Sequence, residues 1–177
     1  MPAHELDTID LSILAVLQRN GRASNVAIAE QTHLTAPPVL RRTRTLEEAG
    51  YIKGYHARLD AKRLGFEVSA FLFVGLKRQS ETDVKAFEAR VGTWPLVREC
   101  YSLSGQTDFL MKCVAHDMTE LQGFVTNTLS ATDNVDAVRT AFCVSVIKDE
   151  PTPPLSQVFA PAPPPARRPL RLPPVRR

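Results

Sequence analysis

Features that would indicate a membrane or secreted protein are missing from this 177-residue sequence. No apolar run approaches the roughly 20 residues that cross a bilayer, so we expect no membrane-spanning helix and no membrane partner. The opening residues, MPAHELDTID, are acidic and lack an apolar core, and they are not expected to act as a signal peptide. Three cysteines, Cys100, Cys113 and Cys143, show no CxxC spacing. They favour reduced thiols and a cytoplasmic location over a disulfide framework.

Patterns typical of enzymes and metalloproteins are also lacking. The sequence has no Gly-rich phosphate loop, no nucleophile elbow and no paired acid and base. Its four histidines are scattered, and none has metal-ligand spacing to a cysteine; Cys113 and His116 lie three apart, but across the predicted end of a strand. We therefore expect no catalytic residues, no metal site and no cofactor.

Acidic residues are absent from residues 151–177, which hold five arginines and ten of the fourteen prolines. Residues 1–63 carry nine Lys or Arg against seven Asp or Glu, and residues 64–150 carry eight against twelve. The net acidic middle suits a polyanion poorly, so contact with DNA is expected from the ends of the chain or from a cationic face within residues 1–63. The tail, residues 150–177, has too little apolar mass to fold and is predicted to be disordered, with polyproline II stretches.

Apolar periodicity predicts three short helices in the first 50 residues. The first spans Asp7 to Gln18, and Ser24 is placed to cap a second over Asn25 to Gln31. The third, Ala36 to Ala49, contains two prolines that are tolerated only in a first turn, so it begins at Ala36 or at one of them. Two short helices joined by a tight turn, the second bearing arginines, indicate a helix-turn-helix that enters the major groove of DNA.

The third helix is expected to combine an inward stripe with an outward basic face. Its inward residues are predicted to be Val39, Leu40 and Leu46. Contact with DNA is predicted for Ser24, Asn25, Thr35, Ala36, Pro38, Arg41, Arg42 and Arg44. Because bidentate arginine is the commonest specific contact to guanine, we assign the groove to Arg41 and Arg42, and a phosphate to Arg44. Two alternatives stay open: a solvated cationic face, or Arg42 paired with an acidic residue inside the domain.

After the third helix the pattern changes twice. Residues 51–55 are predicted to form a strand or hairpin, the wing of a winged helix, and residues 56–66 a polar connector. From Val68 onward, alternating runs predict a β-α-β-β-α-β order, the split ferredoxin-like arrangement. The predicted strands are 68–76, 97–103, 108–114 and 138–147, and the predicted helices are 80–91 and 117–129.

The turn between the two middle strands contains Gly105, Gln106, Thr107 and Asp108. Glycine permits backbone angles or close approach that a side chain would block. The other three supply an amide, a hydroxyl and a carboxylate, which together suit the ammonium and carboxylate of an amino acid. A plain β-turn, in which Asp108 accepts local backbone hydrogen bonds, is the alternative.

Five motifs, in order over about residues 5–149, resemble the Lrp/AsnC family of bacterial and archaeal regulators. They are Asp7-x-x-Asp10-x-x-Ile13-Leu14, Asn20-Gly21-Arg22-Ala23-Ser24, Thr35-x-x-Pro38-Val39-x-x-Arg42-x-x-x-Leu46-Glu47, Gly50-Tyr51-Ile52 and Ser104-Gly105-x-x-Asp108-Phe109-Leu110. Two features depart from the family pattern. Thr43 stands where the family usually has an apolar residue, and the proline-arginine tail is not a family feature.

The resemblance implies an α+β fold in three parts: a winged helix-turn-helix DNA-binding domain with linker at 5–66, a ligand-binding and oligomerisation (RAM-like) domain at 67–149, and the tail at 150–177. It implies a transcription regulator that binds double-stranded operator DNA. It also implies homodimers formed by pairing sheets, which join into higher even-numbered oligomers. An amino acid or related metabolite would bind near Gly105–Asp108.

Two other functions are weighed against this one. The arginine-rich tail would also suit an architectural, nucleoid-associated protein that binds DNA with little sequence choice. A metabolic enzyme built on the ferredoxin-like half is disfavoured by its missing catalytic set.

Overall fold

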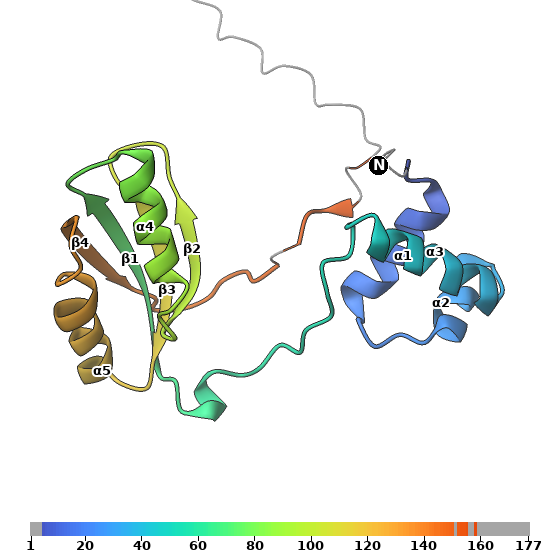
Figure 1. Cartoon of the computed structure of the whole chain (residues 1–177). Helices are drawn as coiled ribbons and strands as arrows, with labels where there is room; N and C mark the ends of the chain where they lie inside the picture. The colour runs from blue at the N-terminus through green and yellow to red at the C-terminus, as the bar shows by residue number, and fades with distance from the viewer. Residues whose placement is uncertain (1–4, 151, 156–157, 159–177) are drawn as a thin grey trace, which may run out of the picture. The chain divides into compact units, whose positions relative to one another are not determined.

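The computed structural model describes residues 5–150, 152–155 and 158, which divide into two compact units (Figure 1). Unit 1 contains the described residues up to Ala57 together with those from Glu150 onward, and unit 2 spans Arg58–Asp149. No helix in the described ranges is long and apolar enough to cross a membrane. The rest of the predicted disordered tail, residues 151, 156–157 and 159–177, lies outside the described residues.

The first two helices of unit 1 begin at side chains that cap their free N–H groups. Helix α1, Thr8–Arg19, starts after Asp7, whose carboxylate accepts from the backbone N–H of Asp10 at 2.7 Å. Helix α2, Asn25–Thr32, starts after Ser24, whose hydroxyl accepts from the N–H of Ala27 at 3.2 Å. Both helices were predicted to within one residue, because capping is a local property that neighbouring residues determine.

Helix α3, Ala36–Glu48, follows a tight turn at His33, whose φ of 55° is left-handed. The helix begins at Ala36, so both prolines fall in its first turn. It ends in a Schellman motif at Gly50, with φ of 78°. There the N–H of Tyr51 bonds the carbonyl of Leu46 at 3.0 Å.

Val39, Thr43 and Leu46 form the buried stripe of α3, at i, i+4 and i+7. Val39 and Leu46 pack with Ile13, Val16, Ile28 and Ala29 in the core of unit 1. The prediction that Leu40 faces inward is wrong, since its side chain is 38% exposed. The next residue after Val39 is turned about 100° around the helix, which takes Leu40 out of the stripe.

The predicted wing does not form as a strand. Residues 51–55 join no ladder in the described part of the chain, and the following connector contains only a short 3-10 helix, η1, Lys62–Leu64. A strand requires a neighbour to satisfy its backbone groups. The local pattern signals extended backbone but does not determine where a pairing strand would lie, and residues 51–55 are assigned to no strand.

Unit 2 is a four-stranded antiparallel sheet of order β2-β3-β1-β4, with helices inserted as the ferredoxin-like prediction required. Its elements are β1 Val68–Leu76, α4 Glu81–Val91, β2 Val97–Ser102, β3 Phe109–Ala115, α5 Met118–Gly123, a π-helical continuation η2 Phe124–Leu129, and β4 Val135–Phe142. The strand β4 begins and ends earlier than predicted. Its last pair joins Phe142 to Ala70, and Ala70 is only two residues from Val68, where β1 begins. Little of β1 is therefore left to pair with residues beyond Phe142.

One face of the sheet is covered and the other is open. Helices α4 and α5 lie on the same face (Figure 1), where Leu72, Met111 and Phe87 are among the buried core residues. Phe71 and Phe73, on the opposite face of β1, remain half-buried. The guanidinium of Arg139 lies 4.4 Å from the ring centroid of Phe73, a cation–π contact.

Candidate nucleic-acid interface and effector loop

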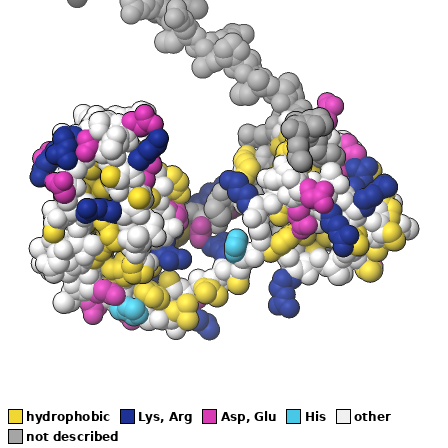
Figure 2. Space-filling view, viewed as in Figure 1, with side chains coloured by type: hydrophobic (Ala, Val, Ile, Leu, Met, Phe, Trp, Pro, Cys, Tyr) yellow, Lys and Arg dark blue, Asp and Glu magenta, His cyan; other side chains and the backbone are white. Residues whose placement is uncertain are grey.

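The outward face of α3 carries a stripe of polar, basic and apolar side chains. Residues one turn apart line a shallow hollow of about 320 Å³: Pro37, Leu40, Arg41, Arg44, Thr45 and Glu48. In Figure 2, unit 1 shows dark-blue basic side chains next to yellow hydrophobic surface. A face that combines donors with an exposed aliphatic side chain can meet both the base edges and the thymine methyl groups of a major groove.

Arg41 and Arg44 are both exposed, and neither guanidinium has a partner among the described side chains. Their separation of three residues places them on the same side of the helix. Two unpaired cations side by side on an exposed helix face are free to contact an anionic ligand without first breaking a protein contact.

Arg42, unlike Arg41 and Arg44, is paired with acidic residues of its own domain, which is one of the alternatives that the sequence left open. Its Nη1 lies 2.8 Å from Asp7 Oδ2 and 2.8 Å from Asp10 Oδ1. The backbone N–H of Asp10, and then Arg42, hold the pKa of Asp7 below its usual range. The side chain of Asp10 is only 1% exposed, whereas that of Asp7 is 47% exposed, so the guanidinium joins one buried and one half-exposed carboxylate of α1 and its cap to α3. We therefore no longer assign Arg42 to the groove.

The start of α3 supplies few backbone donors. Pro37 and Pro38 have no N–H, and the Val39 N–H already bonds the Thr35 carbonyl at 3.4 Å. The side chain of Thr35 makes no capping hydrogen bond, and it is exposed beside Ala36. An anion near this helix end would therefore meet fewer backbone N–H groups than at an ordinary helix start, and side chains such as the Thr35 hydroxyl would have to supply more of the contacts.

The other predicted contacts lie at the start of α2. Ser24 is exposed, although its hydroxyl is engaged as the cap, and Asn25 is half-buried as the first residue of the helix. One residue that the sequence analysis missed is Tyr55, whose hydroxyl donates to Glu47 Oε1 at 2.9 Å. Burial, and then Glu47, raise the pKa of Tyr55 to about 12. No local signal marks this contact.

The predicted effector loop is the turn of the β2–β3 hairpin. Gly105 has φ of 151°, which disfavours any residue with a side chain, although nothing lies within 4 Å of where a Cβ would be. Gln106 is exposed and Thr107 half-buried. The hairpin closes through the Leu103 N–H, which donates to the Asp108 carbonyl at 2.8 Å.

The carboxylate of Asp108 ties this hairpin to the end of β1. Its Oδ2 accepts from the Leu76 N–H at 2.7 Å, and its Oδ1 accepts from Gln79 Nε2 at 2.8 Å. The bond to Leu76 is a backbone bond, as the plain-turn alternative proposed, but it spans 32 residues and is not local. In this conformation both carboxylate oxygens of Asp108 are engaged in hydrogen bonds that hold the loop. The exposed face of the loop is therefore formed by Gly105, Gln106 and Thr107.

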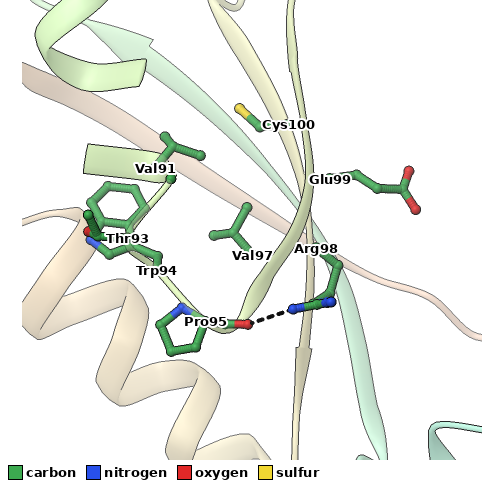
Figure 3. Close-up of a pocket in the computed structure, with 9 residues that line it drawn as sticks. Val91, Thr93, Trp94, Pro95, Val97, Arg98, Glu99 and Cys100 are labelled. Carbon is green, nitrogen blue, oxygen red and sulfur yellow. Dashed lines mark hydrogen bonds between the residues drawn. The ribbon is translucent and has the colours of Figure 1, made fainter. Parts of the chain in front are cut away.

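A second hollow, of about 310 Å³, lies between the end of α4 and β2 (Figure 3). Val91, Trp94 and Val97 contribute apolar surface to it, and Arg98 donates from Nη1 to the Pro95 carbonyl at 3.4 Å. It shares no residue with the predicted effector loop. Within the described ranges, no group of three or more His, Cys, Asp or Glu is placed to hold a metal ion.

A helix-turn-helix with an exposed basic helix, joined to a ferredoxin-like domain, defines a DNA-binding transcriptional regulator. Two family matches bear this out: "Winged helix-turn-helix DNA-binding" at residues 6–53 and "Lrp/AsnC ligand binding domain" at residues 69–153. The chain is 52% identical over 145 residues to a leucine-responsive regulatory protein of Rhizobium meliloti, covering 82% of this chain and 93% of that protein. It is 39% identical over 151 residues to the Bkd operon transcriptional regulator of Pseudomonas aeruginosa, covering 85% and 99%.

Among solved structures, a transcriptional regulator from Neisseria meningitidis in complex with L-Met matches with a TM-score of 0.83 and 35% identity, over 88% of this chain and 100% of that chain. The chain belongs to the Lrp/AsnC family of transcriptional regulators. The motif-based resemblance is thereby confirmed, as are the α+β fold and the regulatory function. The individual DNA-contacting and ligand-contacting residues remain predictions.

Proposed function

We propose that the protein regulates transcription by sequence-specific reading of operator DNA through the outward face of α3. The observation that carries this proposal is the pair Arg41 and Arg44 on one exposed helix face, whose guanidiniums have no partner in the part of the chain that the structure describes. Arg41 reads a guanine edge, and Arg44 contacts a phosphate. Leu40, beside them, packs on a thymine methyl group. Its exposed fraction of 38% supports this role, which the sequence pattern missed.

The active form is proposed to be a homodimer, joined through the open face of the sheet, that assembles into higher even-numbered oligomers. Half-buried Phe71 and Phe73 give this face the apolar surface that an interface between two copies needs. A two-fold axis would present two α3 helices to successive major grooves. The operator is then an imperfect palindrome with half-sites about one helical turn apart.

The effector is proposed to be an amino acid or a related small metabolite, and we propose no other cofactor. The family domain matched here is named for ligand binding, and relatives are named as leucine-responsive or were solved with L-Met. We place the effector at the exposed face of Gly105, Gln106 and Thr107, with Asp108 holding the loop. Because a regulator of this kind acts on the chromosome, we place the protein in the cytoplasm.

The test compares Arg41→Ala and Arg44→Ala on a duplex site that the wild-type protein selects from a random library, and on a scrambled version of that site. Arg41→Ala should reduce the preference for the selected site by roughly 5- to 100-fold, because it removes a base contact. Arg44→Ala should weaken both duplexes alike and reduce the salt dependence by about one phosphate contact.

Arg90→Ala is the matched control, since Arg90 is an exposed arginine in the last turn of α4 and outside the helix-turn-helix. It removes the same charge and should leave the preference unchanged. If Arg41→Ala and Arg44→Ala both behave like Arg90→Ala, α3 is not the reading helix.

A further inference from the structure

Arg42 joins α3 to the start of α1 through one nitrogen atom. Its Nη1 lies 2.8 Å from an oxygen of Asp7 and 2.8 Å from an oxygen of Asp10. The other oxygen of each carboxylate belongs to the capping box of α1. Asp7 Oδ1 accepts from the Asp10 N–H at 2.7 Å, and Asp10 Oδ2 accepts from the Asp7 N–H at 3.3 Å. The backbone of α1 therefore orients both carboxylates so that their second oxygens face the guanidinium.

The apolar contacts of α3 fix its rotation less tightly than these hydrogen bonds do. Its buried stripe consists of Val39, Thr43 and Leu46, and the Thr43 hydroxyl has no hydrogen-bond partner among the described residues. Burial of apolar surface has no preferred direction, so it tolerates a small turn of the helix. A hydrogen bond between a guanidinium and a carboxylate depends on both distance and direction, so it does not.

Reading of a base edge depends on this rotation. Arg41 lies about 100° around the helix axis from Arg42. A turn of about 20° moves a group at the roughly 6 Å outer radius of a helix by about 2 Å. That displacement exceeds the tolerance of about 0.5 Å within which a binding group must be held. The contacts that fix the rotation of α3 therefore decide whether Arg41 meets a base edge.

We propose that Asp7, Asp10 and Arg42 set the rotation of α3 about its axis, and thereby the position from which Arg41 reads the half-site. The proposal rests on the reading function proposed above for α3 and adds the residues that control it. Asp7 and Asp10 act through Arg42, and Arg42 acts through the helix that carries it. All three are positioning residues, and none of them contacts a base.

Burial keeps Arg42 in this role when DNA is present. The exposed fraction of the side chain is 1% for Asp10, 29% for Arg42 and 47% for Asp7. A move of the guanidinium to a phosphate would take it from a buried carboxylate, which costs far more than separating an ion pair on the surface. Arg41 and Arg44 are exposed and are not held in this way. The same helix thus has two arginines for the duplex and one for its orientation.

The experiment measures the affinity of the full chain carrying Asp7→Asn for the selected and the scrambled duplex, by fluorescence anisotropy. Asparagine also caps helices, so its side-chain oxygen can keep the bond from the Asp10 N–H. Its amide then presents N–H groups to Arg42 in place of an acceptor. The preference for the selected duplex should fall roughly 3- to 10-fold, less than for Arg41→Ala, because Arg41 is displaced and not removed. The salt dependence should stay the same, because no phosphate contact is lost.

Two variants of Arg42 test the same link from the side of α3. Arg42→Met removes the charge and keeps an unbranched apolar stem, and it should lower the preference at least as much as Asp7→Asn. The two changes combined should cost no more preference than Arg42→Met alone, because both act through one contact. Arg42→Lys keeps a cation whose single nitrogen can bond both carboxylates, so it should keep more of the preference than Arg42→Met.

Two control variants separate positioning from stability and from charge. Ile28→Val trims a buried residue in the core of unit 1 outside the Asp7, Asp10 and Arg42 cluster, so it lowers stability and leaves the cluster in place. Melting curves establish that each variant is folded at the assay temperature. Asp136→Asn removes the same charge from an exposed position on β4 in unit 2. Both controls should leave the preference unchanged.

Three outcomes overturn the proposal. One is an Asp7→Asn protein that keeps the preference of Asp136→Asn. Another is a loss of preference that Ile28→Val reproduces at a similar melting temperature, because the cluster is then only structural. The third is tighter binding of both duplexes by Asp7→Asn with a steeper salt dependence, because the released Arg42 then contacts DNA itself. Failure of the proposed function is distinct: Arg41→Ala itself then leaves the preference unchanged, and the cluster has no reading residue to position.

Discussion

The hydroxyl of Thr43 is a polar group in the otherwise apolar inward stripe of α3. It lies between Val39 and Leu46 on the inward face of α3 and is 8% exposed. Among the described residues, its buried hydroxyl has no hydrogen-bond partner. A polar group that leaves water without gaining a partner costs free energy, typically about 1–3 kcal/mol in proteins.

We expect Thr43→Val to raise the free energy of unfolding by about 1 kcal/mol, because a methyl group of similar size replaces the unpaired hydroxyl. Urea denaturation followed by circular dichroism would measure it. Thr45→Val is the control, since the Thr45 hydroxyl donates to the Arg41 carbonyl at 3.1 Å. The control should bring no gain, and a loss of stability in Thr43→Val would contradict the interpretation.

The three arginines of α3 have the same chemistry but different surroundings. Arg42 is held by Asp7 and Asp10, whereas Arg41 and Arg44 point to solvent. Helical geometry explains the difference, since the residue before Thr43 lies beside the buried stripe and within reach of α1. Which carboxylates lie within reach of Arg42 depends on how α1 packs against α3.

At the scale of elements, the β2–β3 hairpin is tied to β1 through one carboxylate. Asp108 accepts from the Leu76 N–H and from Gln79, and its own N–H donates to the Val74 carbonyl at 3.1 Å. The loop that carries the predicted effector residues is therefore built on the end of the central strand. A ligand that displaced either bond would act on both elements together.

We expect Asp108→Ala to lower the free energy of unfolding of unit 2 by about 1–3 kcal/mol, because it leaves the Leu76 N–H without its acceptor. Gln106→Ala, on the exposed turn of the same hairpin, is the control and should change stability by less than about 0.5 kcal/mol. Hydrogen exchange at Leu76 gives the direct measurement. Protection of that amide in Asp108→Ala equal to the wild-type value would refute the role assigned to the carboxylate.

Two elements differ from their predicted form for the same physical reason. Residues 51–55 and 143–147 have alternating or apolar patterns that favour strands, yet neither is assigned to a strand, although the Cys143 N–H still bonds the Ser69 carbonyl of β1 at 2.8 Å. Val144 and Ile147 are 97% and 92% exposed. A strand depends on a neighbour for its hydrogen bonds, and pattern alone does not say where that neighbour ends.

At the scale of the whole molecule, the open face of the sheet is the apolar surface left uncovered in unit 2. Phe71 and Phe73 lie on it, and Arg139 stacks on Phe73. Helices cover only the opposite face. A half-covered sheet of this kind is completed when a second copy packs against it.

We expect Phe73→Glu to dissociate the proposed homodimer, because a carboxylate buried in that interface would lose its hydration. Sedimentation velocity at micromolar concentration would show the smaller species, and affinity for a two-half-site operator should fall at least tenfold as bivalent binding is lost. Ala89→Glu, on the exposed surface of α4, is the control and should sediment like the wild type. A Phe73→Glu protein of unchanged mass would exclude this face as the interface.

Local chemistry in the sequence determined the helices with their caps, the first strand and the ferredoxin-like order, because these depend on residues within a few positions of one another. The motifs in order also determined the family. Tertiary packing decided the rest: the partners of Arg42, the exposure of Leu40, the bond from Asp108 to Leu76 and the end of β4. Each of these depends on which distant residue lies opposite, and that is set only when the elements pack together.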